Sequence, residues 1–311
     1  MAITRQRVIT TAIVLLIAIT GILIVSQGFG EEFKNTKTSS NNLNVSKVFP
    51  VPDSVSFADE KMPLGNFDTR ESLEREIIMT AYRHASTIMI IKRTTRYFPV
   101  IEKILKEYNI PDDFKYLTVA ESELSNLISP AGATGFWQIM PETGKEEGME
   151  INNEVDERYS IEKSTKFACE YFLKSYARYG NWTLAAASYN GGRNGLDEQI
   201  DIQHEKNYYD LLLNDETSRY IFRVIAYKLI INDPTAYGFE IDKKELYPVM
   251  KYNEVKVDTA VTDFSNFAKK FGTNYKLLKL LNPWLRKPYL TNKSGRSYPV
   301  KIPAEGSRIS D

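Results

Sequence analysis

The stretch Phe114-Lys-Tyr-Leu-Thr-Val-Ala-Glu-Ser122 places a carboxylate where a helix would normally bury an apolar side chain. A helix that begins after residues 111–113 would carry four residues along one face: Phe114, Leu117, Glu121 and Leu124. A carboxylate on that face loses hydration, so its pKa rises from about 4.3 toward the roughly 6–7 that suits a proton donor at neutral pH. Glu121 is therefore a candidate general acid. A buried Glu that an arginine or a backbone donor satisfies is the alternative.

The segment after this helix, residues 129–135, reads Ser-Pro-Ala-Gly-Ala-Thr-Gly and has too many small and helix-breaking residues to continue it. It leads into Phe-Trp-Gln-Ile-Met at 136–140, where an aromatic ring stands beside an amide. Such a pair suits a sugar, whose C–H face rests on the ring while its hydroxyl groups bind the amide. Residues 187–192, Ala-Ser-Tyr-Asn-Gly-Gly, repeat the pairing at a glycine turn. In the alternative interpretation Trp137 is a core residue and Asn190-Gly191 only a turn.

These segments together resemble the motifs of family 1 lytic transglycosylases, which cleave peptidoglycan on a lysozyme-like fold. The matching residues are Glu121-Ser122, Ser129-x-x-Gly132-Ala133-x-Gly135-x-x-Gln138, Ala187-x-Tyr189-Asn190-x-Gly192 and Tyr220 after Glu216-Thr217. Residues 135–144 are most similar to the D branch of the membrane-bound murein transglycosylases. The resemblance covers roughly residues 70–240. Leu124 and Gly191 depart from the residues common in the family, an aromatic and an alanine, which bears on one sugar subsite.

The resemblance implies a mechanism with one carboxyl group, although most glycosidases use two. Glu121 would protonate the glycosidic oxygen between N-acetylmuramic acid and N-acetylglucosamine. It would then take the proton of the muramoyl C6 hydroxyl, which closes on C1 and leaves a 1,6-anhydro product. Ser122 would orient the carboxyl group. The other candidate substrate-binding residues are Gln138, Tyr189, Asn190, Tyr220 and, as the ring platform, Trp137.

The composition argues against other kinds of chemistry. The two histidines, His84 and His204, lie in separate segments, so neither a His-ligated zinc site nor a Ser-His triad is expected. Lys plus Arg and Asp plus Glu balance at 40 each, so no net basic field draws the chain to nucleic acid. Cys169 is the single cysteine and cannot form an internal disulfide. We expect no metal, no cofactor and no nucleic-acid partner; peptidoglycan strands are the expected ligand, and protein partners are not indicated.

Residues 1–26 predict an N-terminal transmembrane helix. Arg5 and Arg7 precede the almost wholly apolar run 8–25, which at 1.5 Å per residue spans about 27 Å, close to the hydrocarbon core of a bilayer. With the positive end in the cytoplasm, the rest of the chain faces outward. We expect an uncleaved inner-membrane anchor with the catalytic domain in the periplasm; a cleaved signal peptide is the alternative.

Four further segments follow the anchor. Residues 27–65, polar and then rich in proline, predict a flexible linker, and 66–245 a mainly helical catalytic domain. Residues 246–303 predict a small α+β unit, with a strand at 255–257, helices at 265–271 and 275–281 and a strand at 298–303. This order resembles a degenerate LysM module, a fold that binds N-acetylglucosamine-containing glycans. A packing domain without glycan affinity is the alternative, and 304–311 is a tail.

Two other functions compete with the transglycosylase. A lysozyme-like hydrolytic muramidase would position a water molecule and would normally carry a second acid. A non-catalytic, membrane-anchored peptidoglycan-binding protein would not need Glu121. The chemical form of the product ends distinguishes the muramidase from the transglycosylase. The effect of Glu121→Gln on wall digestion distinguishes the binding protein from an enzyme.

Overall fold

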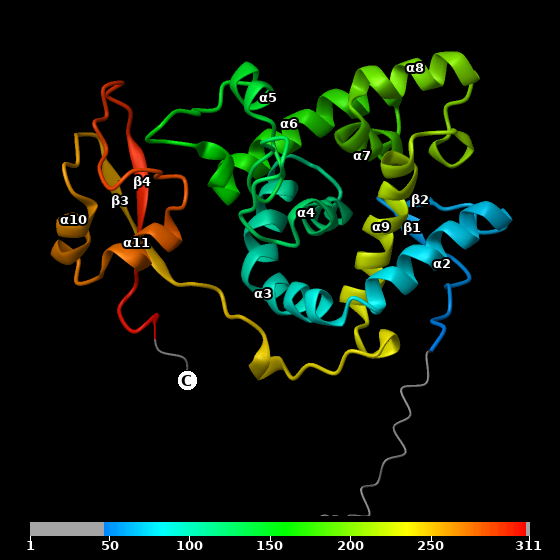
Figure 1. Ribbon diagram of the computed structural model, residues 1–311, viewed down its shortest axis with the longest axis horizontal. Coiled ribbons are helices and arrows are strands. Elements are labelled where there is room, and N and C mark those ends of the chain that lie inside the picture. The colour runs from blue at the N-terminus through cyan, green and yellow to red at the C-terminus, as the bar shows by residue number, and fades with distance from the viewer. Residues whose placement is uncertain (1–46, 309–311) are drawn as a thin grey trace, which may run out of the picture. The chain divides into compact units, whose positions relative to one another are not determined.

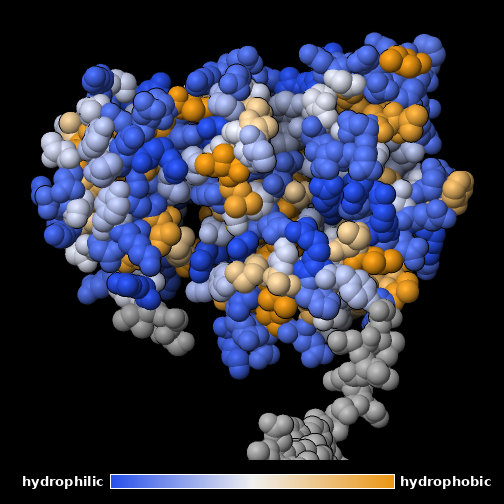
Figure 2. Space-filling model, viewed as in Figure 1, coloured by the Kyte–Doolittle hydropathy of each residue, from blue (hydrophilic) through white to orange (hydrophobic). Residues whose placement is uncertain are grey.

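The structure is a computed structural model that describes residues 47–308 (Figure 1). The predicted anchor, residues 1–26, and the first part of the predicted linker lie outside the described residues. Within residues 47–308, no helix is both long and apolar enough to cross a membrane. The face in Figure 2 is mostly hydrophilic, with its hydrophobic residues in small patches. Most large apolar side chains accordingly lie in the interior.

The described chain up to residue 246 is mainly helical, as predicted. Its α-helices are α2 (Phe67–Ala81), α3 (His84–Glu107), α4 (Lys115–Ser122), α5 (Pro141–Glu146), α6 (Ile161–Tyr179), α7 (Trp182–Gly191), α8 (Arg193–Gln203) and α9 (Asp215–Asn232). Single turns of 3-10 helix lie between these helices or after α9: η1 (Asp112–Phe114), η2 (Glu157–Tyr159), η3 (Tyr208–Asp210), η4 (Thr235–Tyr237) and η5 (Lys243–Glu245). Helix α6 begins at Ile161, where the Ser160 side chain caps its first turn, and ends before Gly180, which has a φ of 73°.

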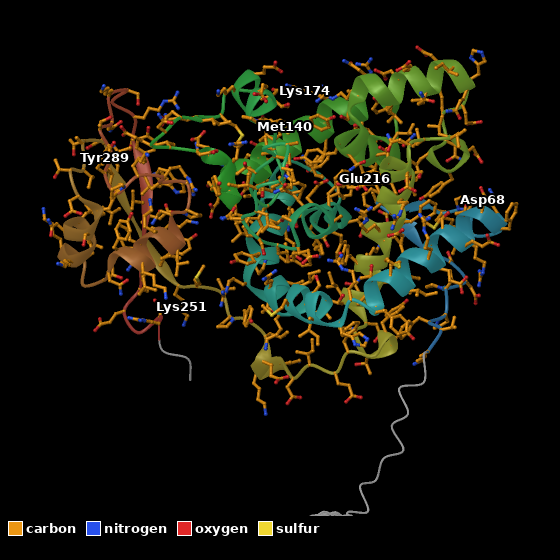
Figure 3. The ribbon with its side chains drawn as sticks, viewed as in Figure 1. Asp68, Met140, Lys174, Glu216, Lys251 and Tyr289 are labelled. Atoms are coloured by element: carbon orange, nitrogen blue, oxygen red, sulfur yellow. The ribbon has the colours of Figure 1, made fainter. Side chains whose placement is uncertain are left out.

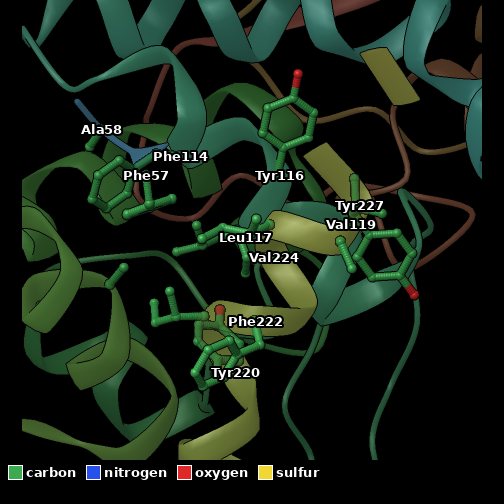
Figure 4. Close-up of a cluster of buried hydrophobic side chains, with 14 of the residues drawn as sticks. Phe57, Ala58, Phe114, Tyr116, Leu117, Val119, Tyr220, Phe222, Val224 and Tyr227 are labelled. Carbon is green, nitrogen blue, oxygen red and sulfur yellow. The ribbon is translucent and has the colours of Figure 1, made fainter. Parts of the chain in front are cut away.

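Helix α4 is buried on several sides. Six of its eight residues are buried, which is typical of a helix at the centre of a domain. Figure 4 shows Leu117 and Val119 of α4 gathered with Val224 of α9 in one cluster of the core. Helix α9 also packs against α2 and α7. The position of Glu121 is therefore fixed by the packing of a central helix.

The predicted helix is too long at its C-terminal end. Helix α4 ends at Ser122, because Glu123 and Leu124 adopt left-handed φ angles of 52° and 55°. Leu124 is still buried, at 1% exposure. Glu123 accepts hydrogen bonds from Arg83 at 2.5 Å and from Ser86 at 2.7 Å, and Arg93 donates to its carbonyl oxygen. These contacts hold the chain in the turn that follows α4.

The prediction of a flexible linker is wrong for residues 49–65. This segment forms a hairpin of β1 (Ser56–Phe57) and β2 (Glu60–Lys61), and Phe57 is fully buried with its ring 5.2 Å from that of Phe114. The Glu60 carboxylate accepts hydrogen bonds from the backbone N–H groups of Trp182 and Thr183, at the N-terminus of α7. Prolines indicate irregular backbone, and here that backbone is packed on the helical domain.

The C-terminal unit has the predicted order of elements. Strands β3 (Tyr252–Val257) and β4 (Tyr298–Pro303) pair antiparallel, with Tyr252 opposite Pro303 and Val257 opposite Tyr298. Helices α10 (Phe264–Lys270) and α11 (Tyr275–Leu281) lie between them in the chain. Alternate residues of β4 are buried: Tyr298, Val300 and Ile302. A small helix-and-strand module therefore follows the helical domain, as expected.

The core of this module also contains residues of the helical domain. Val155 and Tyr159, at 1% and 6% exposure, belong to the same buried cluster as Phe264, Leu285 and Val300. Residues from 49 onward group into one compact unit. The boundary predicted near residue 246 therefore divides the chain, but the core of the module also contains residues that precede this boundary.

Candidate active site

Glu121 lies in the last turn of α4, and α9 brings Tyr220 to it. The Tyr220 hydroxyl donates a hydrogen bond to Glu121 Oε1 at 2.5 Å, across 99 residues of sequence. Tyr220 is 1% exposed, whereas Glu121 keeps partial exposure to solvent. Burial raises the pKa of the Tyr220 hydroxyl well above its usual range, and the charge of Glu121 raises it further. Tyr220 therefore remains a donor throughout the neutral range.

Burial of the Glu121 carboxyl group raises its pKa from 4.5 to about 7. Two interactions oppose this rise, the hydrogen bond from Tyr220 and the positive charge of Arg223, while the charge of Glu216 reinforces it. Figure 3 shows Glu216 in the first turn of α9. A carboxyl group with this pKa is protonated in a large fraction of molecules at neutral pH and can still accept a proton once it is ionised.

The hydrogen bonds of the Ser122 hydroxyl go to backbone carbonyl groups and not to the Glu121 carboxyl group, and its side chain is buried. It is 1% exposed, and its hydroxyl donates to the carbonyl oxygens of Phe136, at 2.9 Å, and Thr118, at 3.1 Å. The expectation that Ser122 binds substrate is wrong, because its side chain is buried; its role in orienting the Glu121 carboxyl group stays a prediction. Because the hydroxyl links the end of α4 to the segment 135–138, Ser122 fixes that segment relative to α4.

Gln138 lies in this segment with a left-handed φ of 47°. Its Nε2 donates to the carbonyl oxygens of Gly135, at 2.8 Å, and Leu127, at 3.2 Å. A pair of backbone hydrogen bonds between Thr134 and Ile139, both 3.0 Å, closes the turn around it. Both amide hydrogens are thereby directed to the protein, which leaves Oε1 to accept a hydrogen bond from a ligand.

Trp137 is a core residue, and the prediction of a sugar platform at this ring is corrected. It is fully buried, its Nε1 donates to Thr165 Oγ1 at 2.9 Å, and its ring lies 5.7 Å from that of Phe172. Its carbonyl oxygen accepts a hydrogen bond from the Tyr189 hydroxyl at 2.7 Å. The sequence pattern of an aromatic residue next to an amide does not show whether the ring faces the solvent or the core. Here the ring faces the core.

Tyr189 and Asn190 come to the site from the end of α7. Burial raises the pKa of Tyr189 well above its usual range, and the nearby charge of Glu121 adds to the rise. Asn190 Oδ1 accepts a hydrogen bond from Thr217 Oγ1 of α9 at 3.0 Å. A Cβ atom on Gly191 would lie 2.9 Å from Thr217 Cγ2, so the glycine allows α7 and α9 to approach closely.

The structure thus gathers Glu121, Tyr189 and Tyr220 at one site, with Gln138 and Asn190 on the adjoining segments. Sequence reasoning missed Thr217 and Arg223. Both lie within three residues of Tyr220 on α9, and helical spacing from Tyr220 is the signal that could have found them. Among residues 47–308, no group of three or more His, Cys, Asp and Glu side chains could hold a metal ion.

Residues 98–212 match the family model of the transglycosylase SLT domain. Residues 253–306 match that of the soluble lytic transglycosylase C-terminal LysM-like domain. The helical part of the chain is thus similar to an SLT domain, and the C-terminal part to a LysM-like domain. The observed helical fold and C-terminal strand module are consistent with these two matches.

Two curated relatives carry the name membrane-bound lytic murein transglycosylase D, one from Escherichia coli K12 and one from Escherichia coli O6:H1. Each is 26% identical to this chain over 223 residues, which is 69% of this chain and 48% of the relative. The chain thus spans about half the length of the curated relatives that it matches.

Proposed function

We propose that this protein is a peptidoglycan lytic transglycosylase, with Glu121 as its single acid and base. The observation that carries the proposal is the desolvated Glu121 carboxyl group, whose pKa is raised to about 7 and which is bonded to Tyr220. The SLT-domain match includes this residue, and the similar proteins are named lytic murein transglycosylases.

In the proposed reaction, Glu121 donates its proton to the glycosidic oxygen as the bond to C1 of the muramoyl residue breaks. The C6 hydroxyl of the same sugar then forms a bond to C1, and its proton passes to Glu121, which restores the starting state. Tyr220 donates to Oε1 throughout, so the mobile proton belongs on Oε2. The hydrogen bond favours the ionised form that exists between the two proton transfers.

The remaining polar groups suit the binding of a glycan. Gln138 Oε1 would accept a hydrogen bond from a sugar hydroxyl or amide, and Asn190 Nδ2 would donate one, because the other amide atoms of both residues bind protein groups. The Tyr189 hydroxyl is bound to a carbonyl oxygen, so its contribution is the shape of the cleft beside Glu121.

A hydrolytic muramidase is the competing reaction. Two other carboxylates merit consideration as its second acid. Glu216 is ion-paired with Arg223 at 2.9 Å, and its side chain is 58% exposed; Glu123 is bound to Arg83 and Ser86. Because both carboxylates are bound by other side chains, neither is placed to activate a water molecule. This supports the single-acid mechanism.

Mass spectrometry of purified peptidoglycan digested by the full chain tests the proposal. We expect 1,6-anhydro ends, which are lighter than reducing ends by one water molecule. Reducing ends alone would establish hydrolysis instead. Glu121→Gln should abolish product formation, whereas Glu146→Gln, an exposed acid on α5, should leave it unchanged. Absence of any product from the wild type would favour the non-catalytic binding role.

The cell envelope is the proposed location, since the relatives are named membrane-bound and residues 1–26 have the composition of an anchor. Fractionation of cells that express the full chain should find it in the inner membrane and digestible from the periplasmic side. A soluble periplasmic product with a new N-terminus would instead favour a cleaved signal peptide. Co-sedimentation of the Glu121→Gln full chain with insoluble peptidoglycan would test whether the protein binds the glycan when it cannot cleave it.

A further inference from the structure

The segment from Glu150 to Tyr159 lies in the helical domain by sequence but is held by the C-terminal module. Val155 pairs with Leu285 in a β-bridge. The backbone N–H of Asp156 donates to the carbonyl oxygen of Trp284 at 2.9 Å, and the N–H of Arg286 donates to that of Glu154 at 2.7 Å. These contacts add a short stretch of backbone to the module.

Side chains hold the same segment. Glu154 accepts hydrogen bonds from the backbone and the hydroxyl group of Thr291, at 2.7 and 3.1 Å. Glu150 accepts from Arg296 at 3.0 Å and from the Tyr298 hydroxyl at 2.8 Å. Both carboxylates belong to the segment, and these three donor residues belong to the module. The segment is therefore tied to the module along its length.

Arg158 connects this segment to the cleft. It is 7% exposed, and its guanidinium group forms two hydrogen bonds with the Asp156 carboxylate, at 2.8 and 3.0 Å. Its Nη1 donates to the carbonyl oxygens of Gly132, at 3.0 Å, and Ile139, at 3.1 Å. These two carbonyl groups lie on either side of Gln138 in the chain. A buried guanidinium group requires such acceptors, so the position of the loop and that of Arg158 are coupled.

The loop also lies directly against the backbone at Arg158. A Cβ atom on Gly135 would lie 2.1 Å from the Arg158 carbonyl oxygen, and Gly135 itself has a φ of 85°. The loop is thus supported from two directions. Ser122 holds the Phe136 carbonyl from α4, and Arg158 holds Gly132 and Ile139 from the segment bound to the module.

We infer that Arg158 is a positioning residue for the active site, through which the C-terminal module fixes the loop 132–139 and its Gln138 beside the catalytic helix. The inference rests on the proposed function for its kinetic consequence only. On this view the module is part of the support of the cleft, in addition to any binding of glycan.

Arg158→Gln in the full chain tests the kinetic consequence, with Arg158→Lys as the conservative variant. Displacement of a substrate-positioning group by about 1 Å costs roughly 100-fold in rate, so we expect kcat to fall 10- to 100-fold in Arg158→Gln and less in Arg158→Lys. The pH midpoint near 7 should not move, because Arg158 is not among the groups that shift the pKa of Glu121. A fall in activity that matches the unfolded fraction, or an unchanged kcat, would overturn the inference.

Amide hydrogen exchange provides a test that does not depend on activity. The N–H groups of Thr134 and Ile139 bond to each other's carbonyl oxygens. Their exchange should accelerate at least tenfold in Arg158→Gln, while amides in the middle of α6 keep their protection. Asp156→Asn, which removes the charge that orients Arg158, should accelerate the same two amides to a smaller degree.

Unchanged exchange at Thr134 and Ile139 in Arg158→Gln would overturn the positioning role, whatever the activity. If the wild type forms no 1,6-anhydro product but these amides respond, the proposed function fails and the structural coupling stands. The two failures are therefore distinguishable.

Discussion

Replacement of Tyr220 by Phe isolates the hydrogen bond to the Glu121 carboxyl group. The Tyr220 hydroxyl donates to Glu121 Oε1 at 2.5 Å, and this bond lowers the pKa of Glu121 against the effect of burial. The change removes one oxygen atom from a fully packed ring and leaves the desolvation of Glu121 in place. The pKa of Glu121 should therefore rise above its present value of about 7.

The magnitude follows from the charged acceptor. A hydrogen bond to a charged group contributes about 1.5–3 kcal/mol, and about 1.4 kcal/mol corresponds to a tenfold change in an equilibrium or a rate. The activity of a general acid falls as the pH rises through its pKa. The alkaline limb of the pH–rate profile should therefore move to higher pH by about one to two units. The carboxylate formed after proton donation loses the same stabilisation, so the plateau should fall roughly 10- to 100-fold.

The assay is the rate of release of 1,6-anhydro products from purified peptidoglycan between pH 5 and pH 9. Tyr237→Phe is the matched control, because Tyr237 is another buried tyrosine, in η4, and makes no hydrogen bond to Glu121. It should leave both the limb and the plateau where they are. An alkaline limb that stays in place or moves to lower pH in Tyr220→Phe would refute the reasoning.

Three further predictions concern stability and the loop. Because the pKa of Glu121 is raised to about 7, the folded chain binds more protons than the unfolded chain between about pH 4.5 and pH 7 and loses stability as the pH rises through that window. Glu121→Gln should therefore be more stable than the wild type to urea at pH 8, by up to about 3 kcal/mol, with little gain at pH 4; a gain independent of pH would contradict this. Gly135→Ala requires a Cβ atom 2.1 Å from the Arg158 carbonyl oxygen at a φ of 85°, so it should lower the thermal midpoint and kcat together, and a variant that retains both would show that the loop can move. Asn282→Ala removes a fully buried amide that bonds to Leu278 and to both backbone groups of Lys301; urea unfolding should report a loss of about 2–3 kcal/mol, and a loss within error of zero would count against it.

Helix α6 could be predicted from sequence to the residue. Its apolar period is regular, a serine caps its start, and Gly180 takes the left-handed conformation that ends it. The module was also predictable in order, because its strands and helices are short and the asparagine that ends α11 lies in a Leu-Asn-Pro turn. Local signals were sufficient wherever they agreed with the packing.

The end of α4 could not be predicted in the same way. No glycine or proline follows Ser122, and the helix stops because Arg83, Ser86 and Arg93, 30 to 40 residues earlier, hold the chain at Glu123. Contacts with residues so far away in the sequence cannot be inferred from the pattern of apolar and polar residues around Ser122. The length of α4 is therefore a tertiary property.

Site chemistry was easier to predict than site geometry. The position of Glu121 on an apolar helical face indicated a raised pKa, which the structure bears out. The inward turn of Trp137 and the bonding of Ser122 to Phe136 depend on which way each side chain faces. A motif records residue types and spacing, and it carries no information on that direction.

The folded segment at residues 49–65 shortens the chain that would separate a membrane anchor from the helical domain. Phe49 is already part of the folded domain, since its ring lies 5.8 Å from that of Tyr237. If residues 1–26 span the inner membrane, only residues 27–48, roughly twenty, separate the bilayer from the folded domain, and even fully extended they measure about 75 Å. The linker predicted from sequence was nearly twice as long. An enzyme anchored in this way would reach only glycosidic bonds within that distance of the membrane. Bonds farther from the membrane would be inaccessible to it, even if they fitted the cleft.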